Sequence, residues 1–238
     1  MYMNDLQLNL LEIQENIARA ARKAGRRPED ITLVGVTKTI PPERIREALA
    51  LGVSNFGENR VQEFLSKYEE VIDKNLTTNW HMIGHLQTNK VRFIIDKVKL
   101  IHSVDSLRLA QKINKCAEQN KCKINVLIEI NIANENTKQG VLPENAMEFI
   151  EQMHRLPNIC TNGLMCIAPY VEDPEENRIH FKKMYKLFVD IQQKKMHNVD
   201  MHFLSMGMTG DYQVAIEEGA NIIRVGTGLF GHRNVKEV

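Results

Sequence analysis

One lysine of this sequence stands where a buried strand should end. Residues 34–38 are Val-Gly-Val-Thr-Lys, a mostly apolar and β-branched run, and prolines follow at positions 41 and 42. Such a run predicts a short interior strand whose alternation places Lys38 on the same face as Val34 and Val36. Removal from water disfavours the charged form of a lysine, and a neutral amine can condense with an aldehyde to give a Schiff base. Lys38 is therefore the first candidate for chemistry, with an ammonium group that simply reaches solvent as the alternative.

Two segments near the C-terminus combine glycines with hydroxyl side chains. Ser205-Met206-Gly207 begins one of them, which continues to residue 210, and Gly226-Thr227 begins the other. Backbone N–H groups in such loops bind phosphate, so we expect both segments to cradle one, with plain turns as the alternative. Residues 226–231 also fit the pattern G-x-G-x-x-G, but no second strand and acidic residue follow, so a dinucleotide site is disfavoured.

Arg224 lies just before the second glycine segment, in the apolar run Ile-Ile-Arg-Val-Gly. An arginine that faces a protein interior needs a hydrogen-bond acceptor or a carboxylate. In a pyridoxal phosphate site the acceptor would be an unprotonated pyridine nitrogen. A cofactor held in this way is a weaker electron sink than one whose pyridine nitrogen pairs with an aspartate. An ion pair with Glu129 is the alternative.

Metal binding has little support in the sequence. His81 and His85 are four residues apart, but their segment has the pattern of a strand and lacks the glutamate of a helical zinc motif. The four cysteines form no C-x-x-C pair, which is typical of reduced thiols in a cytosolic protein. We therefore expect no metal.

The elements that must position these residues alternate along the chain. Apolar runs predict eight strands, each separated from the next by a helical pattern, and a further amphipathic helix precedes them at residues 5–22. Eight such units predict an α/β fold with one (β/α)₈ barrel, a TIM barrel, and place the functional site at the carboxyl ends of the strands. A doubly wound open sheet is the alternative. The expected strands are residues 31–38, 53–59, 80–86, 100–104, 124–132, 159–167, 202–206 and 221–225.

Composition limits the classes of function. The 238 residues show no linker or shift in composition, so one domain over residues 1–238 is expected. With 31 basic and 30 acidic residues, no overall field favours nucleic acid or an anionic membrane. No apolar run suits a spanning helix or a secretory signal, which predicts a cytoplasmic protein. We expect a monomer.

Several motifs together resemble one family, the pyridoxal phosphate homeostasis proteins. The resemblance extends over nearly the whole chain, with the motifs in the same order. Its one small departure is Thr209-Gly210, where the family often has serine followed by a different residue. The motifs are residues 36–38 (VTK), 56–63 (FGENRVQE), 80–90 (WHMIGHLQTNK), 103–106 (SVDS), 131–132 with Glu135, Lys138 and Gly140, 163–165 (GLM), 204–208 (LSMGM) with Asp211, and 224–227 (RVGT).

The resemblance implies a barrel like the N-terminal domain of alanine racemase, with pyridoxal 5′-phosphate as cofactor. By that resemblance Lys38 carries the Schiff base, and Arg224 faces the pyridine nitrogen. Asn59 and Met165 would lie beside the ring. Ser205, Gly226 and Thr227 would hold the phosphate, with Met206 and Gly207 in the same loop as Ser205.

The same resemblance implies a role in intracellular vitamin B6 and amino-acid homeostasis, without robust catalysis. In alanine racemases a tyrosine of another domain is the second base, on the opposite face of the substrate Cα. Proton abstraction from one face of the Cα alone gives only slow exchange. A carrier of this kind would pass the cofactor transiently to apoenzymes, and His85, Lys90 or Lys138 could assist. The alternatives are a racemase of low activity that uses His85 or Tyr212 as base, and a cofactor-free barrel in which Lys38 forms an aldolase-type Schiff base.

Overall fold

Eight parallel strands close into a barrel in the computed structural model, which describes residues 3–72, 76–135 and 137–231. Each strand pairs with its neighbours in the sequence, and β8 closes the barrel against β1. The sequence prediction of a (β/α)₈ barrel is therefore confirmed, and the open sheet is wrong. The strands are β1 Thr32–Val36, β2 Asn55–Glu58, β3 Asn79–Met82, β4 Leu100–Val104, β5 Ile124–Ile130, β6 Ile159–Cys166, β7 Val199–Met208 and β8 Ile222–Val225.

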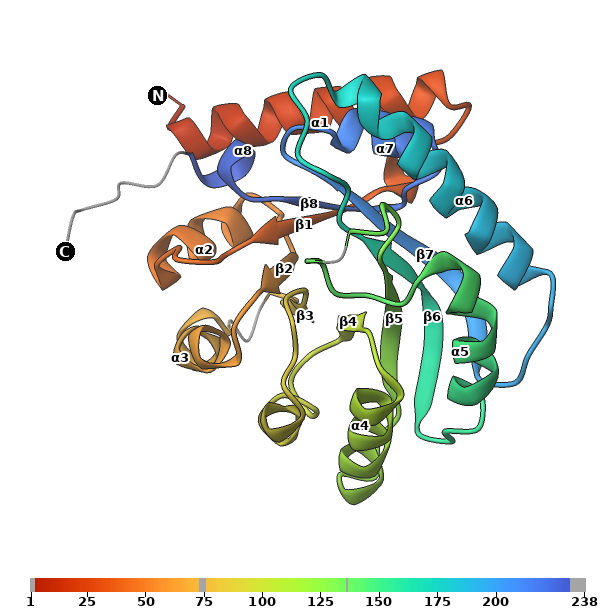
Figure 1. Cartoon of the computed structure of the whole chain (residues 1–238). Helices are drawn as coiled ribbons and strands as arrows, with labels where there is room; N and C mark the ends of the chain where they lie inside the picture. Colours follow the sequence, from red (N-terminus) through yellow and green to blue (C-terminus); the bar gives the residue numbers. More distant parts are fainter. Residues whose placement is uncertain (1–2, 73–75, 136, 232–238) are drawn as a thin grey trace.

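Helices surround the barrel, and the predicted N-terminal helix, α1, lies along the outside of it beside α7 and α8 (Figure 1). Asn4 starts α1 with a capping box, in which its side chain and that of Gln7 each accept a backbone N–H. The apolar face of α1 is buried against the barrel. The α-helices are α1 Asp5–Lys23, α2 Pro42–Ala50, α3 Val61–Val71, α4 Leu107–Gln119, α5 Ala146–Met153, α6 Arg178–Gln192, α7 Tyr212–Glu217 and α8 Thr227–Phe230.

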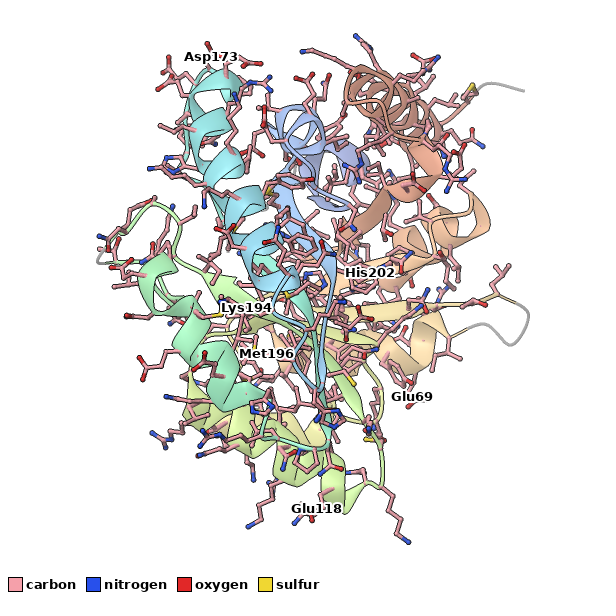
Figure 2. The ribbon with its side chains drawn as sticks, turned by 90° about the vertical axis from the view of Figure 1, so that its right-hand side faces the viewer. Glu69, Glu118, Asp173, Lys194, Met196 and His202 are labelled. Atoms are coloured by element: carbon pink, nitrogen blue, oxygen red, sulfur yellow. The ribbon has the colours of Figure 1, made fainter. Side chains whose placement is uncertain are left out.

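Some connections differ from the sequence prediction. The sequence pattern of residues 89–97 predicts an α-helix, but η2, Thr88–Phe93, is a 3₁₀ helix whose backbone bonds span three residues. The pattern that opens at residue 173 also predicts an α-helix, which in the structure begins as the 3₁₀ helix η4, Pro174–Asn177, before α6; Figure 2 shows Asp173 and Lys194 at opposite ends of this segment. The helical pattern of residues 61–73 predicts an end at Asp73, which lies outside the described residues, as does the tail from residue 232. Two more 3₁₀ helices are η1 Pro28–Asp30 and η3 Pro143–Asn145.

The core has two parts, and the smaller one closes the inside of the barrel. The larger part lies between the strands and the helices. Inside the barrel, five buried side chains from five of the strands pack together: Val34, Leu100, Leu127, Met165 and Ile222. This apolar layer forms the floor beneath the carboxyl ends of the strands, where side chains of a barrel converge.

Within the described residues, no helix combines the length and apolar character needed to cross a bilayer. All four cysteines are free thiols. Burial raises the pKa of the Cys166 thiol to about 12, which makes it unreactive.

Candidate functional site

A cavity of about 370 Å³ opens at the carboxyl ends of the strands. This volume lies within the range of roughly 300–1,000 Å³ that is typical of small-molecule sites. Polar groups from strands far apart in the sequence meet there, as expected for a TIM barrel. Its lining side chains include Val36, Asn59, His85, Glu129, Asn131, Lys138, Met208 and Arg224.

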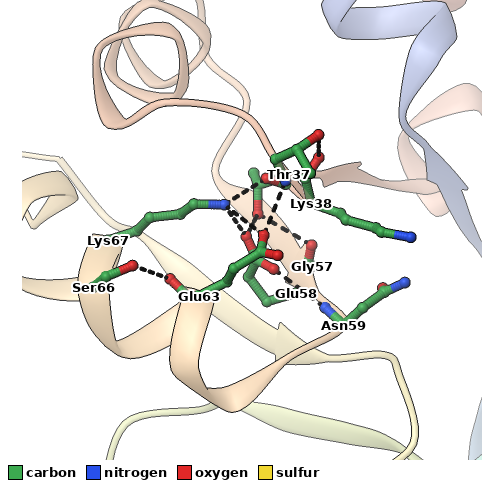
Figure 3. A network of polar contacts seen from close by, with 9 residues as sticks. Thr37, Lys38, Gly57, Glu58, Asn59, Glu63, Ser66 and Lys67 are labelled. Atoms are coloured by element: carbon green, nitrogen blue, oxygen red, sulfur yellow. Dashed lines mark hydrogen bonds and ion pairs between the residues drawn. The ribbon is translucent and has the colours of Figure 1, made fainter. Parts of the chain in front are cut away.

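Lys38 follows β1 directly and continues its inward alternation. Val34 lies in the interior layer and Val36 lines the cavity. Figure 3 shows the side chains of Lys38 and Asn59 extended in the same direction, away from Lys67. Lys38 is partly buried, and none of the described residues pairs with its Nζ in a hydrogen bond or an ion pair. The amine thus extends beside Asn59 of the cavity wall, with no partner in the described part of the chain.

Behind Lys38, a buried ion pair fixes the backbone on which it stands. Lys67 of α3 lies 2.6 Å from Glu58 at the end of β2, and these residues are 6% and 0% exposed. Lys67 Nζ also donates to the carbonyl of Thr37 at 2.7 Å, and Thr37 Oγ1 donates to Glu58 at 2.7 Å. On the other side of Lys38, the backbone N–H of Thr39 donates to Glu63 at 2.9 Å. Both neighbours of Lys38 are therefore anchored to the outer face of the barrel.

The same carboxylate orients Asn59. The backbone N–H of Asn59 donates to Glu58 Oε2 at 3.3 Å, while Oε1 of Glu58 accepts hydrogen bonds from Thr37 Oγ1 and Lys67 Nζ. Asn59 therefore lines the cavity as the sequence placed it, at the end of β2 and next to Lys38. No local pattern predicted the network behind it, because Glu58 and Lys67 each have the sequence context of an ordinary surface charge.

Arg224 of β8 faces the inside of the barrel at the wall of the cavity, and is 4% exposed. Its guanidinium donates to Ser205 Oγ at 2.5 Å and to the Cys166 carbonyl at 2.8 Å. Those contacts use two of its five N–H donors. Among the described residues no carboxylate pairs with it, so the alternative of an ion pair with Glu129 is wrong.

Ser205 does not lie where the sequence placed it. Its hydroxyl is fully buried inside the barrel, where it accepts from Arg224 and meets His102 Nδ1 at 3.0 Å. The reason is the length of β7, which continues to Met208, whereas residue 206 was the expected end. Ser205 is therefore three residues inside the strand and cannot serve as a loop hydroxyl.

Other residues predicted for the site also lie deeper than expected. Met165 belongs to the interior layer below the cavity, and Ile167, two residues further along the chain, lines the cavity instead. Met206 points outward into the helix-facing core. Gly207 has a φ of 90°, and a side chain there would meet Ala215 at 2.6 Å, so glycine is required by both conformation and space.

The structure brings together a different pair of hydroxyls at the mouth of the barrel. Thr209 follows β7 and Thr227 begins α8, and their Oγ1 atoms are 3.5 Å apart. The backbone N–H of Gly228 donates to Thr209 Oγ1 at 3.4 Å. Asn9 of α1 holds α8 by donating to the Leu229 carbonyl at 3.1 Å. Gly226 and Thr227 thus lie at the mouth as predicted, with Thr209 as the third member.

Glu129 of β5 is a buried carboxylate in the cavity wall. Burial, together with the nearby charge of Asp105, raises its pKa to about 7, and the positive charge of Arg224 opposes this rise only in part. A carboxyl group of this pKa exchanges its proton near neutral pH, which the sequence did not indicate.

Of the further residues considered for a role, two line the cavity. His85 is half exposed and lies 3.4 Å from Asp105, and Lys138 pairs with Glu135 at 2.6 Å. Lys90 lines a smaller neighbouring hollow that Asn59 and His85 share. Tyr212 is wrong as a candidate base, because its hydroxyl is bound by Asn16 at 3.0 Å in the packing of α1 on α7.

Comparison with known proteins agrees with this geometry. A sequence profile described as "Alanine racemase, N-terminal domain" matches residues 8–234. A protein of Aquifex aeolicus (strain VF5) named pyridoxal phosphate homeostasis protein is 49% identical over 224 residues, which are 94% of this chain and 96% of the relative.

Two solved structures share the fold over nearly their full length. An unknown protein from Bifidobacterium adolescentis is 32% identical with a TM-score of 0.89, and the match covers 96% of this chain and 97% of that one. PipY of Synechococcus elongatus PCC7942, solved with PLP bound, is 34% identical with a TM-score of 0.79, and the match covers 91% of this chain and 100% of that one.

The buried ion pair behind Lys38 predicts a large loss of stability in Lys67→Met. Glu58 would keep a buried charge without its cation, so we expect the free energy of unfolding to fall by about 3–5 kcal/mol in denaturant titrations. Lys186→Met is the matched control, because Lys186 pairs with Asp190 at the same 2.6 Å on the surface, where such pairs contribute about 0–1 kcal/mol. Equal losses in the two variants would contradict this role for Lys67.

Glu129 predicts a fall in stability with rising pH. Its folded pKa of about 7 lies above the ordinary value of 4.5, so its contribution is full below pH 4.5 and is lost as pH rises through 7. Relative to Glu129→Gln, the wild type should lose up to about 3 kcal/mol of unfolding free energy between pH 4.5 and pH 8. Denaturant titrations of both proteins across this range measure the difference, and parallel pH profiles would show that Glu129 ionises normally.

Proposed function

This chain belongs to the alanine racemase N-terminal domain family and, within it, to the pyridoxal phosphate homeostasis proteins, and from that premise we propose that it holds pyridoxal 5′-phosphate as a Schiff base on Lys38. The observation that carries the proposal is the amine of Lys38 beside the cavity, which pairs with none of the described residues, with Arg224 in the cavity wall. Bound pyridoxal phosphate supplies an aldehyde that can pass between amines, and an electron-poor ring.

The environment of Lys38 fits such a linkage. Condensation of an amine with an aldehyde needs a free amine, and an ion pair would keep a lysine protonated. The available carboxylates near Lys38 are engaged elsewhere: Glu58 by Lys67 and Thr37, and Glu63 by the Thr39 backbone. Glu58 and Glu63 are thus bonded on the side of β1 away from the cavity, and the amine of Lys38 extends on the cavity side.

The remaining donors fit the other two ends of the cofactor. Arg224 retains N–H donors beyond those given to Ser205 and Cys166, and a neutral pyridine nitrogen is an acceptor of the kind they need. For the phosphate we propose the hydroxyls of Thr209 and Thr227 with the backbone of residues 226–228, in place of Ser205. Asn59 would lie beside the ring, and Met165 would support it from below.

The role that this site supports best is storage and delivery of the cofactor in intracellular pyridoxal phosphate and amino-acid homeostasis, with no robust catalysis. An arginine at the pyridine nitrogen keeps the ring neutral and so weakens it as an electron sink. The name of the Aquifex aeolicus relative supports this role. We propose a cytoplasmic monomer that transfers its cofactor transiently to apoenzymes.

Slow racemisation or α-proton exchange is the second candidate activity. The observation that favours it is Glu129, a carboxyl group in the cavity wall with a pKa of about 7, which can accept and return a proton near neutral pH. His85, the base that the sequence suggested, also lines the cavity.

The covalent linkage predicts a visible absorption band when the protein is mixed with pyridoxal phosphate. Borohydride reduces a Schiff base to a stable secondary amine, so we expect mass mapping to find the label on the peptide of Lys38. Lys38→Ala should lose both the band and the label, with Lys186→Ala as the matched control on an exposed lysine.

Retention of the band in Lys38→Ala would overturn the assignment of this lysine. A protein that binds no pyridoxal phosphate would instead favour the cofactor-free barrel. Pyridoxal without phosphate should bind more weakly than pyridoxal phosphate, and Thr209→Val should reduce that difference. An unchanged difference would remove Thr209 from the phosphate site.

The limited catalysis predicts little turnover with amino acids. With the loaded protein in deuterated buffer, D- and L-amino acids should exchange their α-protons slowly, as followed by NMR and chiral chromatography. Any exchange should fall further in Glu129→Gln, because the amide cannot accept the proton. Rapid racemisation by the wild type would show an enzyme in place of a carrier.

A further inference from the structure

A line of hydrogen bonds crosses the inside of the barrel below the cavity. It starts at Arg224, which donates to Ser205 Oγ at 2.5 Å. Ser205 Oγ is 3.0 Å from His102 Nδ1, and His102 Nε2 is 2.9 Å from His81 Nδ1. His81 Nε2 ends the line 3.2 Å from Asn55 Oδ1. Four strands, β8, β7, β4 and β3, thus connect the cavity wall to β2 at the opposite mouth of the barrel.

The far end of this line fixes its polarity, that is, the direction in which each hydrogen bond is donated. Asn55 donates its Nδ2 to Ser54 Oγ at 3.2 Å, which leaves Oδ1 to face His81. Since Oδ1 is only an acceptor, His81 must carry its proton on Nε2, and its Nδ1 then accepts from His102 Nε2. A neutral His102 that donates from Nε2 has an acceptor at Nδ1. The Ser205 hydroxyl therefore donates to His102 Nδ1.

Both histidines are neutral in this arrangement. Burial, with Lys99 nearby, lowers the pKa of His81 to about 4. Burial and the charges of His81 and Arg224 hold the pKa of His102 well below its usual value. Every donor along the line therefore points the same way, from Arg224 toward Asn55, and each bond polarises the next.

The polarity matters for Arg224 because of the single proton on Ser205. With its proton committed to His102, Ser205 presents only lone pairs to the guanidinium. Without an acceptor at His102, that proton would be buried and unpaired, or would turn toward Arg224 and repel it. The second acceptor, the Cys166 carbonyl, is backbone and cannot rotate. The orientation of Arg224 thus depends on His102 through Ser205.

We propose that His102 is a positioning residue, which acts through Ser205 to aim Arg224 at the pyridine nitrogen of the cofactor. This inference rests on the proposed function in one respect, the partner of Arg224. The line of hydrogen bonds itself does not depend on a bound cofactor, so it can be tested separately.

The first experiment measures histidine tautomers in the wild-type protein without added cofactor. Long-range ¹H–¹⁵N NMR distinguishes a protonated ring nitrogen from an unprotonated one, and His81→Asn and His102→Asn assign the two signals. Both histidines should carry a proton on Nε2 only, from pH 6 to pH 8. A proton on Nδ1 of His102, or a doubly protonated ring, would overturn the proposed polarity. Because the tautomers are read in the wild-type protein, this result does not depend on whether a variant binds the cofactor.

The second experiment compares two variants of one side chain with the cofactor bound. His102→Asn places an amide oxygen where Nδ1 was and keeps an acceptor for Ser205. His102→Gln places its amide near His81 and leaves Ser205 without an acceptor. We expect His102→Gln to weaken pyridoxal phosphate binding about tenfold and to shift its visible band, because one hydrogen bond to a charged group is lost. His102→Asn should stay within about threefold of the wild type.

Ser205→Ala breaks the line at another point and should match His102→Gln. The double variant should show no additional loss, because both changes remove the same contact. Equal effects of His102→Asn and His102→Gln, or additive losses in the double variant, would overturn the positioning role. Failure of the proposed function is a separate result, since the borohydride label would then be absent from Lys38 in the wild type as well.

Discussion

The buried pair of Lys67 and Glu58 is the interaction on which the site depends. A carboxylate at the end of β2 is removed from water entirely, which is costly unless a cation and hydrogen-bond donors satisfy it. Lys67, Thr37 and the backbone of Asn59 do so. Because Thr37 and Asn59 are bonded to the same group, one carboxylate fixes the carboxyl ends of both β1 and β2, and Lys38 has no partner among the described residues.

Arg224 poses the opposite problem, a buried cation without a carboxylate. The barrel satisfies it with neutral acceptors, one from a backbone carbonyl and one from a hydroxyl. Neutral acceptors leave the guanidinium with unused donors, whereas a carboxylate would have engaged two of them in a fork. The carboxylate of Glu58 thus lies behind the strands with its cation, Lys67, whereas Lys38 and Arg224 extend toward the cavity.

Glu129 is the exception within the cavity, and its neighbours explain it. Desolvation disfavours its charge more than Arg224 stabilises it, so its pKa is raised to about 7 and both forms of the group are present near neutral pH. A neutral carboxyl is compatible with a buried wall, and it adds a proton that can be exchanged. The amine of Lys38 and the weak acid Glu129 are thus the two groups on which the proposed reversible binding of an aldehyde rests.

The sequence by itself determined the barrel and the place of Lys38, because apolar runs and strand alternation are local properties that can be seen without knowing which strands are neighbours. It also placed Asn59, Gly226 and Thr227 at strand ends, where the barrel puts its site. The tertiary structure alone decided how deep each strand runs. With β7 continuing to Met208, Ser205 lies inside the barrel and Thr209 at its mouth. Met165 packs in the interior layer under the cavity, a depth that depends on barrel closure. The contacts of Glu58 with Lys67 and of Ser205 with His102 join residues from separate elements, and no local pattern predicts them, because only barrel closure brings those elements together.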